Sequence, residues 1–502
     1  MRGFGSGTEF SDRPLHPPCM DSATALPVAP AEALRRLWLA AGGAPAALSA
    51  VTLSGSEPAL PSSFAVGTAA QVAIAASALA SAEIGRLRSG QRPFVQVDMR
   101  HAAAEFRSER YLRIAGAPPP DPWDRIAGLY RCGDGGWVRI HTNFAHHRDG
   151  VLALLACAHE RDAVQRALVA WGALDFEAAA SDAGLVVAAL RTLAEWDAHP
   201  QGQADAALGP LSIERIDVPG AAAPPRPLAP MVAGAAVLAG LRVLELTRVI
   251  AGPVAGRALA AQGAEVLAIS APHLPSIEAT VIDTGRGKRS AHLDLRRPEA
   301  CGTLAALLRD ADVFLQGYRP GAISALGFAP EVLAALRPGI VVGSISAYGH
   351  TGPWARRRGF DSLVQTASGL NAAEAAAAGE PDTPRALPAQ VLDHASGYLL
   401  ALGVQIALGR RATQGGSWQV RVALSRTARW LRSLGRLADG FAAADPRLAD
   451  VADLIEESDS GFGRLSAVSH AGRLSGEPPR WVLPAMPLGS HAPRWDGSEA
   501  RP

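Results

Sequence analysis

The sequence contains few of the residues that build disulfide scaffolds or metal sites. Its 502 residues include four cysteines, at positions 19, 132, 157 and 301, and no two of them have Cys-x-x-Cys spacing. This pattern excludes a disulfide framework and a cysteine-based zinc site, and it is typical of a reducing cytosol. We therefore expect a cytoplasmic protein without a bound metal.

An excess of either charge is also missing. Lysine and arginine total 48 and aspartate and glutamate total 47, so the formal net charge is +1. A balance of this kind does not indicate nucleic acid or an anionic membrane as a partner. Aromatic residues make up 5% of the chain, but 48% is hydrophobic, which excludes disorder of the whole chain. Alanine supplies much of the apolar content and favours helices.

We expect no secretory signal, because Glu9, Asp12 and Arg13 interrupt the N-terminal segment before an apolar stretch can form. Residues 58–82 carry no charge and are long enough to cross a bilayer. This run contains two prolines, Gln71 and several serines, and its apolar residues are mostly alanine, a weak hydrophobe. We therefore expect a buried alanine-rich helix rather than a transmembrane span, and a soluble protein.

Composition divides the chain into five predicted segments. The first is rich in Gly, Pro and Ser without periodicity, and a Pro-rich stretch near the middle has the composition of a linker. The segments are a flexible arm at 1–30, a small-domain-like half at 31–218, a linker at 219–234, a Rossmann-like half at 235–427, and a helical segment with a tail at 428–502.

The half after the linker alternates short apolar runs with helical patterns, which predicts a parallel sheet with right-handed crossovers. A ligand is expected at the carboxyl ends of such strands. The predicted strands are 242–246, 264–269, 312–316 and 339–345, and the predicted helices include 253–262, 298–308 and 330–336. The first half is less regular, with a helix at 68–88, strands at 94–98 and 137–140, and helices within 151–171 and 174–196.

Residues 90–99 resemble residues 415–424, and each segment follows an Ala/Leu-rich helix that ends in arginine. This similarity indicates either a duplicated helix–strand unit or a chance match between alanine-rich sequences.

Several familiar catalytic motifs are missing. The turn after the first strand of the α/β half reads Ala-Gly-Pro-Val-Ala-Gly at 251–256, which lacks the second glycine of a dinucleotide-binding loop. No Walker A lysine, His-Glu-x-x-His or Gly-x-Ser-x-Gly motif is present, which argues against a dehydrogenase, a zinc protease and an α/β-hydrolase. His146 and His147 are adjacent and face different ways, so we interpret them as a solvated pair rather than metal ligands.

Two clusters remain as candidates for chemistry. Residues 286–290 are basic and are expected in a loop near the carboxyl-end crevice, either as a solvated charge run or as a site for a phosphate-bearing ligand. Asp393 immediately precedes a long apolar helix, either as a helix N-cap or as a functional carboxylate.

From about residue 241 to 424 the chain resembles the class III CoA-transferase family (CaiB/BaiF type), which includes formyl-CoA transferase and α-methylacyl-CoA racemase. The resemblance depends on many motifs in order rather than on one. They are Glu-Leu-Thr-Arg-Val-Ile-Ala-Gly-Pro at 245–253, Gln-Gly-Ala-Glu-Val at 262–266, Gly-Lys-Arg-Ser at 287–290, Tyr-Arg-Pro-Gly at 318–321, Ser-Ile-Ser-Ala-Tyr-Gly at 344–349, Gly-Phe-Asp at 359–361, and Asp-His-Ala-Ser-Gly at 393–397.

The resemblance implies an α/β fold with a Rossmann-like parallel sheet in a large domain and a smaller α+β domain. Residues 129–140 and 196–202 resemble the small domain of the family, which normally follows the nucleotide-fold part. Here they precede it, so we predict a permuted segment order. The family forms interlocked dimers, which implies a homodimer.

The resemblance also implies a reaction and site residues. The reaction moves CoA from an acyl-CoA thioester to a free carboxylic acid through an aspartyl–acyl anhydride and an aspartyl-CoA thioester. Asp393 matches the catalytic aspartate. Val249, Ile250 and Ala251 match the loop against CoA, Lys288 matches a contact to the CoA nucleotide, and Arg289 lies in the same motif. Coenzyme A is a substrate here, and no permanently bound cofactor is expected.

Departures from the family pattern keep alternatives open. Gly317 replaces an asparagine, Ala325 replaces an arginine that contacts CoA in some members, and Thr68 aligns with Asp393 in the internal repeat. One alternative is a racemase, although its histidine base is replaced here by Phe360, which removes one of two proton carriers. The other is a catalytically inactive relative that serves as a binding or scaffolding protein.

Overall fold

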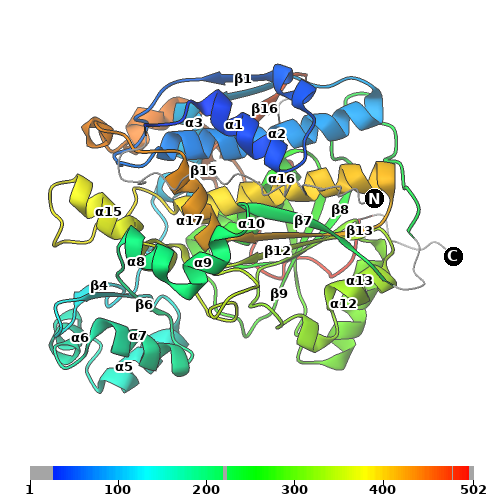
Figure 1. Cartoon of the computed structure of the whole chain (residues 1–502). Helices are drawn as coiled ribbons and strands as arrows, with labels where there is room; N and C mark the ends of the chain where they lie inside the picture. Colours follow the sequence, from blue (N-terminus) through cyan, green and yellow to red (C-terminus); the bar gives the residue numbers. More distant parts are fainter. Residues whose placement is uncertain (1–25, 219–222, 477–478, 497–502) are drawn as a thin grey trace, which may run out of the picture.

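The computed structural model describes residues 26–218, 223–476 and 479–496. The predicted arm at 1–30 and linker at 219–234 therefore lie partly outside the described residues. A seven-stranded sheet with helices on both faces forms the centre of the molecule, and a small lobe extends from one end (Figure 1). The predicted α/β class, with a large and a small part, is confirmed.

The large sheet has the strand order β10-β9-β8-β11-β12-β13-β7. All neighbouring strands are parallel except β7, which pairs antiparallel with β13 at the edge. Val313, Phe314 and Leu315 are fully buried because helices cover both faces of a parallel sheet. The bounds are β7 (Leu211–Ile216), β8 (Arg242–Leu246), β9 (Glu265–Ser270), β10 (Lys288–His292), β11 (Val313–Gln316), β12 (Val341–Ser346) and β13 (Ser417–Ala423).

The strand order reverses between β8 and β11. From β8 the chain moves outward through β9 and β10, and it then returns to the other side of β8 with β11 and β12. The loops that leave β8 and β11 therefore separate and open a crevice at the carboxyl ends of these strands. The helices of this half are α10 (Ala251–Ala261), α11 (Glu278–Gly285), α12 (Pro298–Asp310), η2 (Ser324–Leu326), α13 (Pro330–Leu336), α14 (Asp361–Ala367), α15 (Leu370–Ala377), α16 (Val391–Gln414) and α17 (Leu424–Ser433).

Two long helices, α2 (Val66–Ser89) and α16, pack against each other in the core (Figure 1). Each has 24 residues and is long and apolar enough to cross a membrane by length and composition, but 94% of the most apolar window is buried inside the protein. Their alanines allow this close packing, and Gln405 of α16 donates a 3.1 Å hydrogen bond to the carbonyl of Ser77. The expectation of a buried alanine-rich helix is confirmed.

The same two helices repeat each other in detail. The residue before α2 has φ −74° and ψ 66°, and the residue before α16 has φ −77° and ψ 62°. The third residue of each helix, Thr68 or Asp393, donates its main-chain N–H to a carboxylate, that of Glu57 at 2.6 Å or Asp361 at 2.9 Å. Each helix ends at a glycine and leads into a strand, β2 (Val95–Asp98) or β13. These matching geometries favour a duplicated unit over a chance match.

The structure divides the first half differently from the predicted segment 31–218. A small lobe with its own hydrophobic core spans only Ile126 to Ala189, and β7 belongs to the large sheet. The lobe contains β4 (Gly128–Arg131), β5 (Trp137–Ile140), α5 (Ala145–Leu155), α6 (Arg161–Leu168), α7 (Ala173–Asp182) and β6 (Val187–Ala189), and α8 (Leu193–Ala198) and α9 (Pro200–Ala206) return to the main body. The main body also holds α1 (Pro30–Ala40), η1 (Pro45–Ala50), β1 (Val51–Ser54), α3 (Met99–Glu105), α4 (Ser108–Tyr111) and β3 (Arg113–Ile114).

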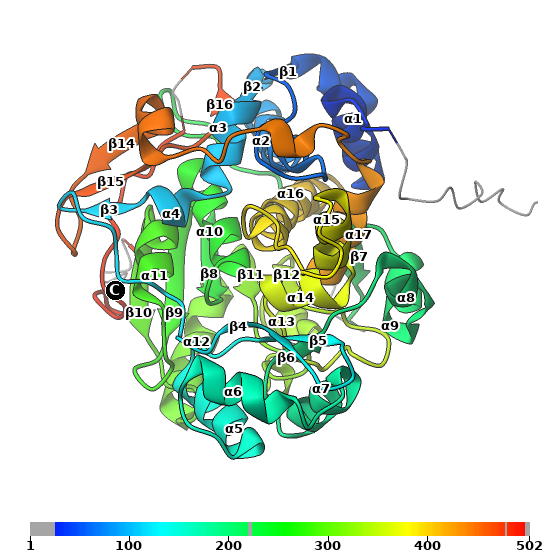
Figure 2. The ribbon, with the colours of Figure 1, turned by 90° about the vertical axis from the view of Figure 1, so that its left-hand side faces the viewer.

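The C-terminal segment differs from the prediction of helix and tail at 428–502. After α17 the structure contains η3 (Gly440–Ala442), η4 (Leu448–Leu454), β14 (Ile455–Ser458), β15 (Leu465–Val468) and β16 (Arg473–Leu474). β15 pairs with β3 and β16 pairs with β2, so this segment lies beside the first half of the chain (Figure 2). The prediction was wrong because β15 and β16 depend on partners more than 300 residues away, which local patterning does not show.

Candidate active site

Asp393 is the third residue of α16 and lies at the crevice formed by the strand ends. Its side chain is 7% exposed and borders a cavity of about 340 Å³. Within the described residues its carboxylate accepts no hydrogen bond, although its main-chain N–H donates to Oδ2 of Asp361. The N-cap of α16 is Gln390. The interpretation of Asp393 as an N-cap is therefore wrong, because the helix begins two residues earlier.

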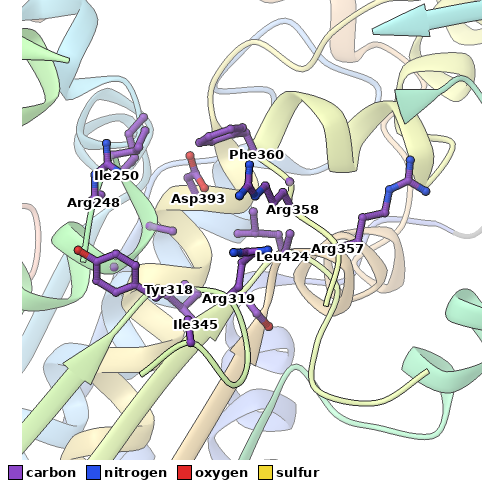
Figure 3. Close-up of a pocket in the computed structure, with 18 of the residues that line it drawn as sticks. Arg248, Ile250, Tyr318, Arg319, Ile345, Arg357, Arg358, Phe360, Asp393 and Leu424 are labelled. Carbon is purple, nitrogen blue, oxygen red and sulfur yellow. The ribbon is translucent and has the colours of Figure 1, made fainter. Parts of the chain in front are cut away.

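The cavity is built at the topological switch point of the sheet (Figure 3). Loops that follow β8, β11 and β12 form one part of its wall, the start of α17 adds Leu424, and the small lobe and the loop before α14 close the other part. The lining residues are Phe144, His146, His147, Arg248, Val249, Ile250, Ala251, Gly252, Gly317, Tyr318, Arg319, Pro320, Ala322, Ile345, Ser346, Ala347, Arg357, Arg358, Gly359, Phe360, Asp393 and Leu424.

The loop from β8 to α10 brings Val249, Ile250 and Ala251 to the same cavity as Asp393. Val249 has φ 69°, a left-handed conformation that is costly for a β-branched residue. Gly397 of α16 allows the close approach, because a Cβ there would lie 2.6 Å from the carbonyl oxygen of Ala251. The strained turn and the missing side chain therefore place the first turn of α10 directly against the second turn of α16.

Asp361, the first residue of α14, lies behind the candidate nucleophile. It is 1% exposed, and the side chain of Gln365 donates a hydrogen bond to its other oxygen. Burial raises the pKa of Asp361 to about 6. Burial also raises the pKa of Asp393 well above its usual value, and the negative charges of Asp361 and Glu109 add to this effect. Two carboxyl groups in this position resist ionising together.

A buried ionic network supports this site from the far side. His394 Nε2 lies 3.2 Å from Glu109 Oε2, and Arg257 of α10 lies 2.6 Å from Asp283 Oδ2. Glu109 belongs to α4 in the first half of the chain, whereas His394 belongs to α16. Ion pairs thus hold the middle of α10 and the start of α16, and sequence reasoning did not identify them because the partners are far apart along the chain.

Lys288 is buried at 4% exposure and does not face the Asp393 cavity. Its Nζ donates to Glu245 Oε2 at 2.8 Å and to the carbonyl of Pro253 at 2.7 Å. Burial lowers the pKa of Lys288, although Glu245 opposes this shift. Gly256 makes room for the pair, because a Cβ there would lie 1.8 Å from the Glu245 carboxylate. Lys288 is among the residues that line a second, smaller cavity of about 80 Å³, and its contact with a CoA nucleotide stays a prediction.

The basic cluster at 286–290 is neither solvated nor unpaired. Arg286 is 2% exposed and lies 2.9 Å from Asp283, and Arg289 forms an ion pair with Asp496. Lys288 aligns with the second residue of β8 in the sheet, so the cluster begins at the amino end of β10 rather than at the carboxyl-end crevice. The interpretation as a solvated loop was wrong, because each cation is paired with an acid. Asp283 comes from the preceding helix α11, whereas Glu245 and Asp496 come from distant segments. The role of Arg289 toward CoA stays a prediction.

The small lobe contributes side chains that the sequence did not assign to the site. His147 is 4% exposed, whereas its neighbour His146 is exposed. The prediction that both side chains are solvated is therefore correct only for His146. The ring of Phe360 stacks on His141 at a centroid distance of 4.0 Å. Arg357 and Arg358 also line the cavity. Three consecutive arginines directly before the Gly-Phe-Asp motif were the available signal for them.

The two departures from the family pattern leave this region open. A Cβ on Gly317 would make ordinary contact with Ile345 at 3.4 Å, so the backbone there has space for a side chain. Ala325 is exposed in η2. The cavity wall is therefore wider at Gly317 than it would be with an asparagine.

Comparison with known proteins agrees with the motifs that line this cavity. The sequence model described as CoA-transferase family III matches residues 238–488, which is half of the chain. The chain belongs to CoA-transferase family III. The matched region begins just before β8 and includes Asp393, Asp361 and the loop at 249–251, so the motifs assigned to the family lie within it.

Individual relatives are similar over a part of their length. The "Probable fatty acyl-CoA transferase Rv3272" of Mycobacterium tuberculosis is 34% identical over 200 residues, covering 37% of this chain and 50% of that protein. The succinate–glutarate CoA-transferase of Agrobacterium fabrum is 34% identical over 206 residues, with 37% and 50% covered. A solved CAIB/BAIF family protein from Brucella suis is 27% identical with a TM-score of 0.35, covering 45% of this chain and 64% of that one. The chain spans about half the length of the first two relatives.

Proposed function

We propose that this chain is a CoA transferase that moves CoA from an acyl-CoA thioester to a free carboxylic acid, with Asp393 as the nucleophile. The observation that carries the proposal is a nearly buried carboxylate that borders an open cavity and receives no hydrogen bond from the described residues. A carboxylate with a purely structural role in such a position is normally paired. This one is left free to react.

The reaction divides into four displacements. An oxygen of Asp393 attacks the thioester carbonyl, the C–S bond breaks, and a CoA thiolate leaves a mixed anhydride. The thiolate attacks the Asp393 carbonyl carbon and releases the donor acid as a carboxylate, which leaves an aspartyl-CoA thioester. The acceptor carboxylate then attacks this thioester and expels the thiolate. Attack of that thiolate on the acceptor carbonyl yields the new acyl-CoA and restores Asp393.

The surroundings of Asp393 favour this chemistry. Burial that raises the pKa of Asp393 also makes its ionised form a stronger nucleophile, because fewer water molecules solvate the charge. α10 begins at Ala251 on the cavity wall, so its first N–H groups have no acceptor within the helix and can stabilise a developing oxyanion. Asp361 fixes the main chain at Asp393 through their hydrogen bond.

The same proposal includes the substrates and setting. We propose acyl-CoA and a carboxylic acid as substrates, with no resident cofactor and with no nucleic acid or membrane as a partner. Val249, Ile250 and Ala251 contact CoA, and Lys288 and Arg289 support its nucleotide part. We further propose a cytoplasmic location and a homodimer, which size-exclusion chromatography with light scattering tests directly.

No observation favours the racemase. Phe360 lines the cavity where that reaction needs a histidine base, and its ring stacks on His141. A phenyl ring carries no proton, so the proton carrier that a racemase has at this position is missing here. The inactive-relative hypothesis is opposed by the access of Asp393 to the cavity.

The test is covalent trapping. The protein is incubated with a panel of acyl-CoAs, quenched with hydroxylamine, and digested for mass spectrometry of the peptide that contains Asp393. We expect a hydroxamate at Asp393, together with CoA transfer, and neither in the Asp393→Asn variant. A folded protein that gives no adduct and no transfer with the whole panel contradicts the proposal. Deuterium uptake at the α-carbon in heavy water without CoA exchange supports a racemase instead.

A further inference from the structure

The cavity that holds Asp393 is strongly cationic. Arg248, Arg319 and Arg358 line it, and Asp393 is the only carboxylate among its described lining residues. In Figure 3 the labelled Arg248 and Arg358 stand on either side of Asp393, and Arg319 lies below them. The three arginines come from three different loops, after β8, after β11 and before α14, so no single local sequence motif accounts for their convergence.

None of these three guanidinium groups is paired with a carboxylate in the described part of the chain. Arg358 donates one hydrogen bond of 2.7 Å to the carbonyl of Gly184, and Arg248 donates to the carbonyl of Pro275. The side chain of Arg319 makes no such contact. By contrast, the adjacent Arg357 lies 3.3 Å from Glu177 and 3.9 Å from the centre of the Trp354 ring. Arg357 is therefore neutralised within the chain, whereas the other three arginines have no carboxylate partner among the described residues.

The positive charge of these arginines also affects the pKa values of two histidines in the small lobe. Burial, followed by the charges of Arg358 and Arg248, lowers the pKa of His146. Burial, the neighbouring His146 and then the same two arginines lower the pKa of His147 to about 3. The pKa of Arg358 is itself lowered by burial and then by Arg319. The arginines thus act on one another and on this wall without a compensating negative charge.

Arg248 and Arg358 are partly buried, whereas Arg319 is exposed. Partly buried cations that lack a carboxylate partner favour an anionic ligand, since pairing recovers the solvation that burial removes. The planar guanidinium group suits a carboxylate especially, because two parallel N–H···O bonds form at once. The guanidinium group of Arg358 is oriented by a hydrogen bond that one of its N–H groups donates to the carbonyl of Gly184, in the loop between α7 and β6. Its remaining N–H groups are available to a ligand.

We propose that the cavity selects a dicarboxylic substrate, whose first carboxylate exchanges CoA at Asp393 while its second carboxylate is bound by Arg358, with Arg319 beside it. This inference rests on the proposed transferase function. The diphosphate of CoA carries the same kind of charge and is the competing source of an anion. The carboxylate is favoured because Arg358 is anchored to the small lobe, whereas the loop at 249–251 assigned to CoA lies on the Arg248 side of Asp393 in Figure 3.

The experiment compares acids of equal length with one or two carboxylates, namely succinate with butyrate and glutarate with valerate, as CoA acceptors from acetyl-CoA. The wild type is expected to favour the diacids. Arg358→Gln should lower kcat/KM for succinate or glutarate about 10- to 100-fold, the loss typical of one charge-assisted contact, and leave the monoacids within about 2-fold. Arg356→Gln is the matched control, because Arg356 is exposed and does not line the cavity. It should change neither value.

Binding to the Asp393→Asn variant separates this inference from the proposed function. Succinate should raise the thermal midpoint of Asp393→Asn, and it should fail to do so when Arg358→Gln is added. An equal loss for diacids and monoacids in Arg358→Gln overturns the inference, since Arg358 then serves CoA or the fold. Failure of succinate to bind Asp393→Asn also overturns it. Absence of transfer with any acid, combined with succinate binding that needs Arg358, supports the diacid site and contradicts the transferase.

Discussion

The main-chain N–H of Asp393 donates a 2.9 Å hydrogen bond to Oδ2 of Asp361, so a second buried carboxylate lies directly behind the candidate nucleophile. The contact positions the first turn of α16 and also brings two like charges close together. The duplicated helix α2 repeats the contact between Thr68 and Glu57. A main-chain hydrogen bond from the third helix residue to a carboxylate is therefore present in both helices, but only α16 has an aspartate, Asp393, as that residue.

The first prediction concerns the pH dependence of transfer. Only the ionised Asp393 is a nucleophile, and the pKa of this group is raised by burial and by Asp361. We expect kcat/KM to fall as pH decreases through this raised pKa, well above the usual range for aspartate. Asp361→Asn removes the like charge but keeps an acceptor oxygen, so the acid limb should move to lower pH by about 1 unit. An unchanged limb in the steady-state pH profile would show that the two groups are not coupled.

The second prediction concerns stability. The pKa of Asp393 is higher in the folded than in the unfolded protein, so the unfolded state loses its proton more readily above about pH 4. The resulting cost to the folded state grows as pH rises and is complete above the folded pKa. Asp393→Asn removes this cost. Its thermal midpoint should exceed that of the wild type by roughly 2–4 °C at pH 8 and should match it near pH 4. A variant less stable than the wild type at pH 8 contradicts this account.

The third prediction concerns the buried pair of Lys288 and Glu245. Removal of one partner leaves a charge without compensation, so Lys288→Met alone should lower the free energy of unfolding by about 3–5 kcal/mol. The double variant with Glu245→Leu should recover most of that loss. Urea titration measures both effects. Equal stability of the single and double variants would mean that the pair is not coupled.

The fourth prediction concerns Gly317. A side chain at this position meets Ile345 at ordinary contact distance, so Gly317→Asn should change the free energy of unfolding by less than about 0.5 kcal/mol. It should narrow the cavity and raise KM for bulky acyl-CoAs more than for acetyl-CoA. Steady-state kinetics with a series of acyl chain lengths tests this. A uniform change across the series would place Gly317 away from the acyl group.

The fifth prediction concerns the duplicate position. Thr68 is 1% exposed and its main-chain N–H is bound to Glu57, so Thr68→Asp places an unpaired carboxylate beside another acid. We expect a loss of roughly 3 kcal/mol in stability and no rescue of transfer in an Asp393→Asn background. Thr68→Val is the uncharged control of similar shape. Recovery of activity in the double variant would reveal a second functional site.

Much of the fold could be predicted from the sequence because its signals are local. Apolar runs with proline and glycine at their ends located β8, β9, β11 and β12 within two residues, and Pro298 and Pro330 marked helix starts. The C-terminal strands escaped prediction because β15 and β16 are short and pair with the distant β3 and β2. β11 has four residues as well, but it lies in a regular alternation of strands and helices, which the C-terminal segment lacks.

The candidate site shows the same division. The sequence by itself determined that Asp393 lies in a family motif next to a long apolar helix, since residue identity and order suffice for that resemblance. Only the tertiary structure decided which charges are free. Lys288 and Arg289 look available along the chain but are paired with distant acids, whereas Arg358 has no carboxylate partner among the described residues and lines the same cavity as Asp393. The physical reason is that the Coulomb energy of a charge depends on its neighbours in space and on its burial, and folding sets both.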